Sequence, residues 1–96
     1  MIMEKGYVYI LTNKNHSVLY IGATKNLKNR IDCHIKGKGA VFTKKYNATI
    51  LVYFEVFDDY SDAFKREKQL KNWHKDWKFN LIKLVNPELK DLYLSL

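Results

Sequence analysis

Hydrophobic residues are concentrated in two short stretches near the start of the chain, and these stretches predict a β-hairpin. Residues 7–12, YVYILT, are β-branched or aromatic except for one leucine, and they contain no glycine or proline. The polar stretch NKNH that follows is typical of a turn, and residues 18–22 predict the returning strand. With the turn centred on the KN pair, Tyr9 would lie opposite Tyr20, and both side chains would project from one face of the sheet.

A helical pattern follows the predicted hairpin. Asn26 is a residue type favoured at helix N-caps, and the GKG stretch ends the pattern after about Lys36. An apolar stripe turned toward the sheet is predicted by three residues at helical spacing, Leu27, Ile31 and Ile35. Arg30 and His34 lie four residues apart on the flank of that stripe, so we expect both side chains to point along the sheet surface.

The rest of the chain predicts one further strand and two helices. We expect residues 37–47, GKGAVFTKKYN, to form a basic and aromatic loop, and residues 49–57, TILVYFEVF, to form the third strand. A helix with Ser61 as its N-cap should run to about Trp73, and another should cover residues 75–85. The order β-β-α-β-α-α predicts an α+β fold with a small three-stranded sheet flanked by helices, in one domain over residues 1–96.

Composition points to a polyanionic partner. The 96-residue chain carries a formal net charge of +7, and its basic residues are interleaved with aromatic ones. Nucleic acid is the simplest such partner, although a basic surface exposed only to solvent gives the same composition. The single cysteine, Cys33, excludes an intramolecular disulfide, and the scattered histidines match no zinc spacing. The first apolar run is too short for a signal peptide or membrane span, so we expect a cytoplasmic protein with no membrane partner.

Glu67 stands out in the helix predicted to begin at Ser61. It falls at the centre of an apolar face formed by Tyr60, Ala63, Phe64 and Leu70. A carboxylate in such a position costs free energy unless a cation or hydrogen-bond donors accompany it. Two interpretations follow: Glu67 pairs with Lys71 one turn later, or it is a metal ligand or catalytic acid facing a shallow pocket.

Four further side chains are suited to phosphate chemistry. Arg30 can contact phosphate oxygens in a bidentate manner, and His34 can act as a general base. Each also has a structural interpretation: Arg30 as a surface cation, His34 as a core residue, and Tyr9 and Tyr20 as packing aromatics. Together with Glu67, the set supplies a base, a charge stabiliser and one metal-binding carboxylate, the requirements of phosphodiester hydrolysis.

These motifs, taken in order, resemble the GIY-YIG nuclease family. YVYIL and LYIG correspond to its two strand motifs, and TKNLKNRIDCHI to the helix that follows. GKGAVFTKKYN, the segment around Glu67 and NPELKDL resemble small stand-alone members related to the incision subunit of bacterial nucleotide excision repair. The resemblance covers nearly the whole chain. It implies a hydrolytic DNA endonuclease that uses one divalent metal ion, Mg²⁺ or Mn²⁺.

The resemblance also implies a role for each site residue. Tyr9 and Tyr20 are the tyrosines of the first and second motifs, and Glu67 is the metal ligand. Arg30 would stabilise charge that develops on the phosphate in the transition state. A tyrosine, Tyr9 in preference to Tyr20, would activate the attacking water, with His34 as its orienter or as an alternative base.

The second motif ends in Gly22, where the absence of a side chain would let the backbone approach the substrate. Some family members have lysine next, where this chain has Ala23, and Lys25 is the candidate replacement. Asn80 and Asn86 are the candidates for an asparagine that many members have late in the domain. These departures leave room for a second hypothesis, a non-catalytic nucleic-acid-binding module that keeps the nuclease fold.

Basic and aromatic residues after the second motif predict the contacts with DNA. Lysines would contact phosphates and aromatic rings would stack on exposed bases. The predicted set is Lys25, Lys36, Lys38, Phe42, Lys44, Lys45 and Tyr46. We expect cleavage to be directed by DNA structure more than by sequence, in DNA repair or recombination, with targeting supplied by a protein partner.

Overall fold

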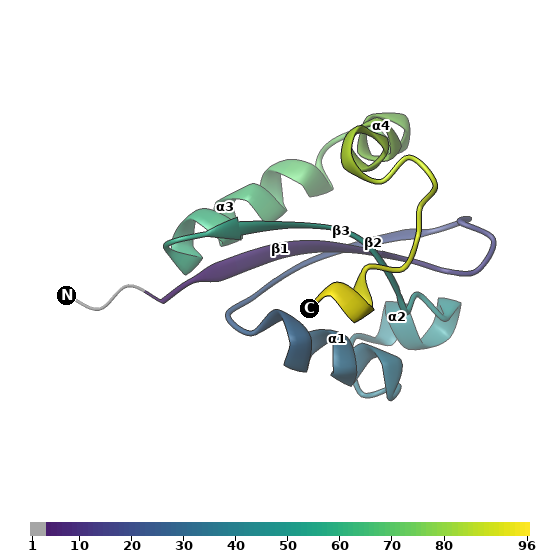
Figure 1. Cartoon of the computed structure of the whole chain (residues 1–96), viewed down its shortest axis with the longest axis horizontal. Helices are drawn as coiled ribbons and strands as arrows, with labels where there is room; N and C mark the ends of the chain where they lie inside the picture. The colour runs from purple at the N-terminus through teal and green to yellow at the C-terminus, as the bar shows by residue number, and fades with distance from the viewer. Residues whose placement is uncertain (1–3) are drawn as a thin grey trace.

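The computed structural model describes residues 4–96 and has a three-stranded antiparallel sheet between two layers of helices (Figure 1). The sheet order is β2-β1-β3, and the strands are β1 (Gly6–Thr12), β2 (Leu19–Thr24) and β3 (Ile50–Phe57). One face is covered by α3 (Tyr60–Lys71) and α4 (Lys75–Val85). On the other side lie α1 (Leu27–Ile35), α2 (Val41–Tyr46) and the 3₁₀ turn η1 (Tyr93–Ser95). The predicted α+β class is therefore confirmed, and β2 is an edge strand.

The pairing of β1 with β2 differs from the predicted register by two residues. Tyr9 lies opposite Gly22, so its predicted pairing with Tyr20 is wrong. The connection is longer than a tight turn because Asn13 Oδ1 accepts a hydrogen bond from the backbone N–H of Ser17 at 2.8 Å. A shift of two residues preserves the alternation of faces. Tyr9 and Tyr20 therefore still share a face, with ring centroids 6.3 Å apart.

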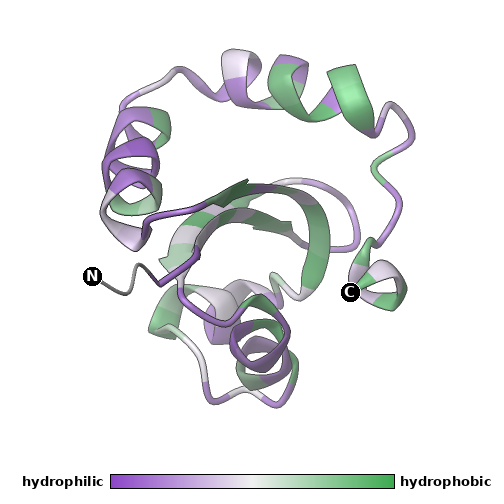
Figure 2. Ribbon diagram, turned by 60° about the vertical axis from the view of Figure 1, so that its left-hand side comes forward, coloured by the Kyte–Doolittle hydropathy of each residue, from purple (hydrophilic) through white to green (hydrophobic). Residues whose placement is uncertain are grey.

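Hydrophobic side chains fill both sides of the sheet, which lies between the helical layers in Figure 2. On the side of α3 and α4, the buried cluster is Val8, Ile10, Ile21, Val52, Tyr53, Ala63, Leu70 and Ile82. On the side of α1, it is Tyr9, Leu11, Leu27, Ile31, Ala48 and Leu51. The two clusters hold the helices against the sheet. No helix within residues 4–96 is long and apolar enough to cross a membrane.

The first helix begins as predicted but buries a different residue at its end. Asn26 is the N-cap of α1, and its side chain accepts a hydrogen bond from the Asn29 N–H. Ile35, predicted to be part of the apolar stripe, is 46% exposed, whereas His34 is 1% exposed. With 3.6 residues per turn, Ile35 is rotated by about 80° from Leu27, but His34 by only about 20°. The helix geometry therefore places His34 in the buried stripe.

The segment predicted as a basic loop contains a short helix, α2. This helix could not be recognised from the sequence, because it has only six residues and its N-cap, Ala40, makes no side-chain capping hydrogen bond. The helix ends at Asn47, which adopts the left-handed conformation with φ of 54°. The N-cap of α3 is Asp59 instead of Ser61, since the Asp59 carboxylate accepts a hydrogen bond from the Ser61 N–H. The range predicted for α4 is confirmed.

Candidate active site

A buried hydrogen bond joins the first-motif tyrosine to the helix histidine. Tyr9 comes from β1 and His34 from α1, and each is 1% exposed. The Tyr9 hydroxyl oxygen lies 2.9 Å from His34 Nε2, and the two rings are 5.6 Å apart. The pair spans the interface between the sheet and α1. Both residues were predicted site residues, and the structure brings them into direct contact.

Thr43 on α2 fixes the direction of this hydrogen bond. Its Oγ1 donates to the Ala40 carbonyl at 2.9 Å and lies 2.9 Å from His34 Nδ1. Because the hydroxyl hydrogen is used by Ala40, Oγ1 accepts the hydrogen bond from Nδ1–H. Nε2 then carries the lone pair of the neutral imidazole, so the Tyr9 hydroxyl donates to it. Sequence reasoning missed Thr43, which lies in the segment predicted as a loop.

The local environment keeps both members of the pair uncharged at neutral pH. Burial, followed by the positive charge of Arg30, lowers the pKa of His34 from 6.5 to about 4. Burial also raises the pKa of Tyr9 from 10.0 to about 12, against the opposing effect of Arg30. The imidazole therefore remains a hydrogen-bond acceptor and the phenol a donor across the physiological pH range.

Arg30 lies beside both motif tyrosines. Its pKa is raised above the usual value, chiefly by its polar contact with the Tyr9 hydroxyl and further by Tyr20. The side chain is half-buried. Within residues 4–96, no carboxylate forms an ion pair with Arg30. Its positive charge therefore lies beside the two phenols and is available to an anionic ligand.

Two glycines leave space for the hydrogen-bonded pair. A Cβ at Gly22 would lie 2.3 Å from the Tyr9 hydroxyl oxygen, because Tyr9 is directly opposite across the strands. A Cβ at Gly39 would lie 2.2 Å from His34 Nδ1. The space in front of Gly22 is thus filled by the phenol of Tyr9. The sequence had instead suggested that a substrate approaches the backbone at this position. The packing requirement at Gly39 was not predicted.

Tyr20 connects the buried pair to the surface. It is half-buried on the edge strand, with its ring 5.4 Å from the His34 ring. On its other side it stacks on Phe42 of α2, with centroids 5.9 Å apart, and Phe42 lies 4.7 Å from Tyr46. Of the two motif tyrosines, Tyr20 is therefore the one that borders the outer surface.

Glu67 comes from α3, on the opposite side of the sheet from α1. Its side chain is 13% exposed, and its carboxylate forms an ion pair with Lys71 at 3.4 Å. Its negative charge contributes to the raised pKa of Tyr9. No group of three potential metal-ligating side chains occurs within residues 4–96. One sheltered carboxylate suits Mg²⁺, which keeps most of its water ligands and binds through one or two carboxylates.

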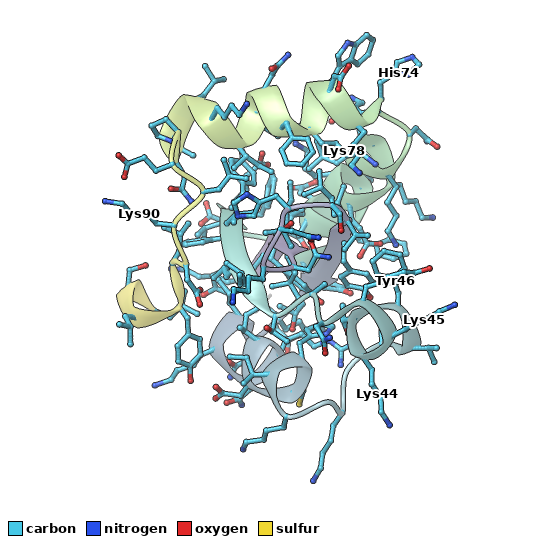
Figure 3. All side chains as sticks on the ribbon, turned by 90° about the vertical axis from the view of Figure 1, so that its right-hand side faces the viewer. Lys44, Lys45, Tyr46, His74, Lys78 and Lys90 are labelled. Atoms are coloured by element: carbon cyan, nitrogen blue, oxygen red, sulfur yellow. The ribbon has the colours of Figure 1, made fainter. Side chains whose placement is uncertain are left out.

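The predicted DNA-binding residues fall into two groups. The first group consists of exposed residues on α2 and in the connection that precedes it. Figure 3 shows three of them, Lys44, Lys45 and Tyr46, projecting outward from α2. Lys36 and Lys38 are exposed in the connection from α1 to α2. Lys25 lies just before the start of α1, where its ammonium pairs with Glu4 at 2.5 Å and lies over the Tyr60 ring.

The two late asparagines occupy different environments. Asn86 is 6% exposed, and its side-chain NH₂ donates to the carbonyls of Val52 and Lys90. Its side-chain oxygen accepts a hydrogen bond from the Lys90 N–H. Asn80 is exposed on α4, in a hollow that it lines with Trp73 and Trp77. Asn86 therefore has a structural role in joining the end of α4 to β3.

Comparison with known proteins gives a consistent result. Residues 5–80 match the family model of the GIY-YIG catalytic domain. The chain is 42% identical to a UPF0213 protein of Staphylococcus haemolyticus over 83% of its own length and 96% of the relative's. A UPF0213 protein of Syntrophus aciditrophicus is also 42% identical, over 90% and 98% of the two lengths. The solution NMR structure of a UPF0213 protein from Bacillus halodurans is similar, with a TM-score of 0.57 and 31% identity, covering 91% of this chain and 92% of that one.

Proposed function

Because the chain belongs to the GIY-YIG catalytic domain family, we propose that it is a metal-dependent endonuclease that hydrolyses phosphodiester bonds in DNA. The observation that carries this proposal is the position of Arg30. Its guanidinium has no ion-pair partner within residues 4–96 and lies beside both motif tyrosines, next to an oriented imidazole. A fixed cation in such a site can bind the scissile phosphate and stabilise the charge that develops on it.

The attacking water needs a base, and burial favours Tyr20 for this role over Tyr9, the residue preferred from sequence. Tyr9 is 1% exposed, whereas Tyr20 is half-buried and borders the surface. A free phenol titrates near pH 10, so a nearby cation is needed to favour loss of its proton. Arg30 is the cation that lies beside Tyr20. Tyr9 and His34 then act as positioning residues, because both rings pack against the Tyr20 ring.

Glu67 is the proposed ligand of the divalent ion, Mg²⁺ or Mn²⁺. When bound there, the ion would supply positive charge that stabilises the leaving 3′ oxygen. Lys71, which pairs with Glu67 in this structure, would release the carboxylate to the ion. Its own ammonium would then be free to contact a phosphate of the same substrate.

The substrate contacts proposed from sequence are retained around α2. Lys36, Lys38, Lys44 and Lys45 would contact the DNA backbone, with Phe42 and Tyr46 against exposed bases. Lys25 would contribute only if DNA displaced its partner Glu4. We place this activity in a single domain over residues 1–96, in the cytoplasm, in structure-directed DNA repair or recombination with a protein partner for targeting. The one cysteine fits a reducing compartment.

A second proposal, a non-catalytic nucleic-acid-binding module, rests on Ala23 and on the Glu67–Lys71 ion pair. At position 23, a metal-dependent nuclease would benefit from a cationic side chain. At Glu67, it would benefit from a carboxylate that is not already paired with a lysine. This module would bind nucleic acid in a salt-dependent manner that neither Mg²⁺ nor Glu67→Gln changes.

Variants of the two key residues separate the proposals. Arg30→Ala should lower the rate of cleavage of flapped or branched DNA by about 10²- to 10³-fold. Glu67→Gln, which keeps the side-chain shape, should abolish metal-dependent cleavage. Lys68→Gln, on the exposed side of the same helix, is the matched control and should cleave like wild type. Full activity of the Arg30 or Glu67 variant would contradict the assigned roles.

A further inference from the structure

A groove crosses the edge strand β2 beside Tyr20. It consists of two adjoining hollows of about 210 Å³ and 240 Å³, which share the lining residues Leu19, Phe42 and Lys78. The first hollow also contains Tyr20 and Lys71. Since Lys71 pairs with Glu67, this end of the groove adjoins the candidate active site. The groove therefore leads away from the site between α2 on one side and α3 and α4 on the other.

Two lysines, Lys75 and Lys78, make the far side of the groove positive. Lys78 points from α4 toward the sheet, whereas His74 at the start of the same helix points away (Figure 3). In the part of the chain that the structure describes, the Lys78 ammonium donates a hydrogen bond only to the Lys71 carbonyl, at 3.5 Å, and burial lowers its pKa. Lys75 donates to the Ser17 carbonyl at 2.5 Å. Within residues 4–96, neither Lys75 nor Lys78 forms an ion pair with a carboxylate.

The near side of the groove is aromatic. Phe42 is 36% exposed and lies between the rings of Tyr20 and Tyr46, with centroid separations of 5.9 Å and 4.7 Å. An exposed phenylalanine opposite unpaired lysines is the arrangement that binds single-stranded nucleic acid, in which phosphates contact cations and bases stack on rings. Base pairs within a duplex are already stacked on their neighbours, so a duplex has no base face to offer Phe42.

We propose that this groove binds an unpaired DNA strand next to the scissile phosphate, with backbone phosphates at Lys75 and Lys78 and a base against Phe42. The inference rests on the proposed function for the position of the scissile phosphate. It adds a substrate class: the preferred substrate has a single-stranded segment at the cleavage site. Lys71, Lys75 and Lys78 lie outside the set of contacts predicted from sequence.

The test is binding of fluorescein-labelled oligothymidylate of about 12 nucleotides, measured by anisotropy in EDTA over a series of NaCl concentrations. The double variant Lys75→Gln, Lys78→Gln should lower the slope of log K against log[NaCl] by about 1.4, because each phosphate contact on a single strand contributes about 0.7. Phe42→Ala should weaken binding by at least about 5-fold. Matched controls are Lys83→Gln on α4 and Val41→Ala on α2, both exposed, which should bind like wild type.

The outcomes separate this inference from the proposed function. Wild-type binding and salt slope in the Lys75, Lys78 double variant would overturn the groove assignment, even if DNA cleavage depends on Glu67. Tighter binding of a blunt duplex than of oligothymidylate, or no binding of oligothymidylate at low salt, would also overturn it. Loss of oligothymidylate binding in the double variant without any cleavage by wild type would support the groove and contradict the nuclease. Circular dichroism of each variant excludes unfolding as the cause.

Discussion

Buried His34 should make the stability of this protein depend on pH in a defined window. Its pKa is about 4 in the folded protein, compared with 6.5 for an unperturbed histidine. Between these values the unfolded chain binds the proton more readily than the folded chain. The contribution of the neutral imidazole to stability is therefore fully present above pH 6.5 and is lost as the pH falls toward 4. The physical cause is that a protonated imidazole would be buried beside Arg30 and could no longer accept the hydrogen bond from Tyr9.

The magnitude follows from the two pKa values. The full difference corresponds to about 3 kcal/mol, of which about 2 kcal/mol should be lost between pH 7 and pH 5. Urea unfolding at intervals across this range measures the loss directly. His34→Gln should remove the dependence on this group, although the variant is less stable at pH 7. His74→Gln, at the exposed N-cap residue of α4, is the matched control and should lose as much stability as wild type.

Comparison of the variants isolates His34 from the carboxylates, which titrate mainly below this range. If wild type and His34→Gln lose the same free energy of unfolding between pH 7 and pH 5, then the imidazole is not held neutral in the core. The assignment of the hydrogen-bond direction from Tyr9 to His34 would then fail as well.

Three substitutions test the packing and hydrogen bonds around the same pair. Gly22→Ala places a Cβ 2.3 Å from the Tyr9 hydroxyl oxygen, so urea unfolding should show a loss of about 1–3 kcal/mol in the free energy of unfolding, and cleavage should be reduced. A free energy of unfolding and a cleavage rate equal to those of wild type would contradict the clash. Thr43→Val keeps the shape but removes the acceptor of the His34 Nδ1–H, so ¹⁵N NMR should show a changed tautomer ratio that Thr43→Ser restores; an unchanged ratio would refute the role of the hydroxyl. Asn86→Ala should cost about 1–3 kcal/mol of stability but leave cleavage per folded molecule unchanged, and a selective loss of cleavage would place Asn86 in the site instead.

The sequence predicted most strands and helices because their signals are local. Residues 49–57 are rich in β-branched and aromatic residues, and Asn26 caps its helix as its side chain predicts. The hairpin register was wrong because it depends on hydrogen bonds between Asn13 and Ser17 inside the turn, which composition does not specify. The short helix α2 was missed because it has no capping side chain.

The candidate site residues could be chosen from the sequence by their chemistry, but their arrangement could not be predicted. Tyr9, Arg30 and His34 were chosen for their chemistry, and the structure brings them together. Thr43 and Gly39 could not be found in this way, because their importance lies in distances to the His34 ring that only the folded chain establishes. The greater burial of Tyr9 relative to Tyr20 likewise depends on tertiary packing.

The most direct test of the proposed nuclease is cleavage of flapped, branched, single-stranded and duplex DNA by the purified protein, with Mg²⁺, Mn²⁺ or EDTA, beside Glu67→Gln. Hydrolysis with the 3′ oxygen as leaving group predicts products with 3′-hydroxyl and 5′-phosphate ends. These products should form only with metal and wild-type Glu67, and most rapidly on substrates with an unpaired strand. Salt-dependent binding without cleavage in any metal, unchanged by Glu67→Gln, would contradict the nuclease and support a non-catalytic module.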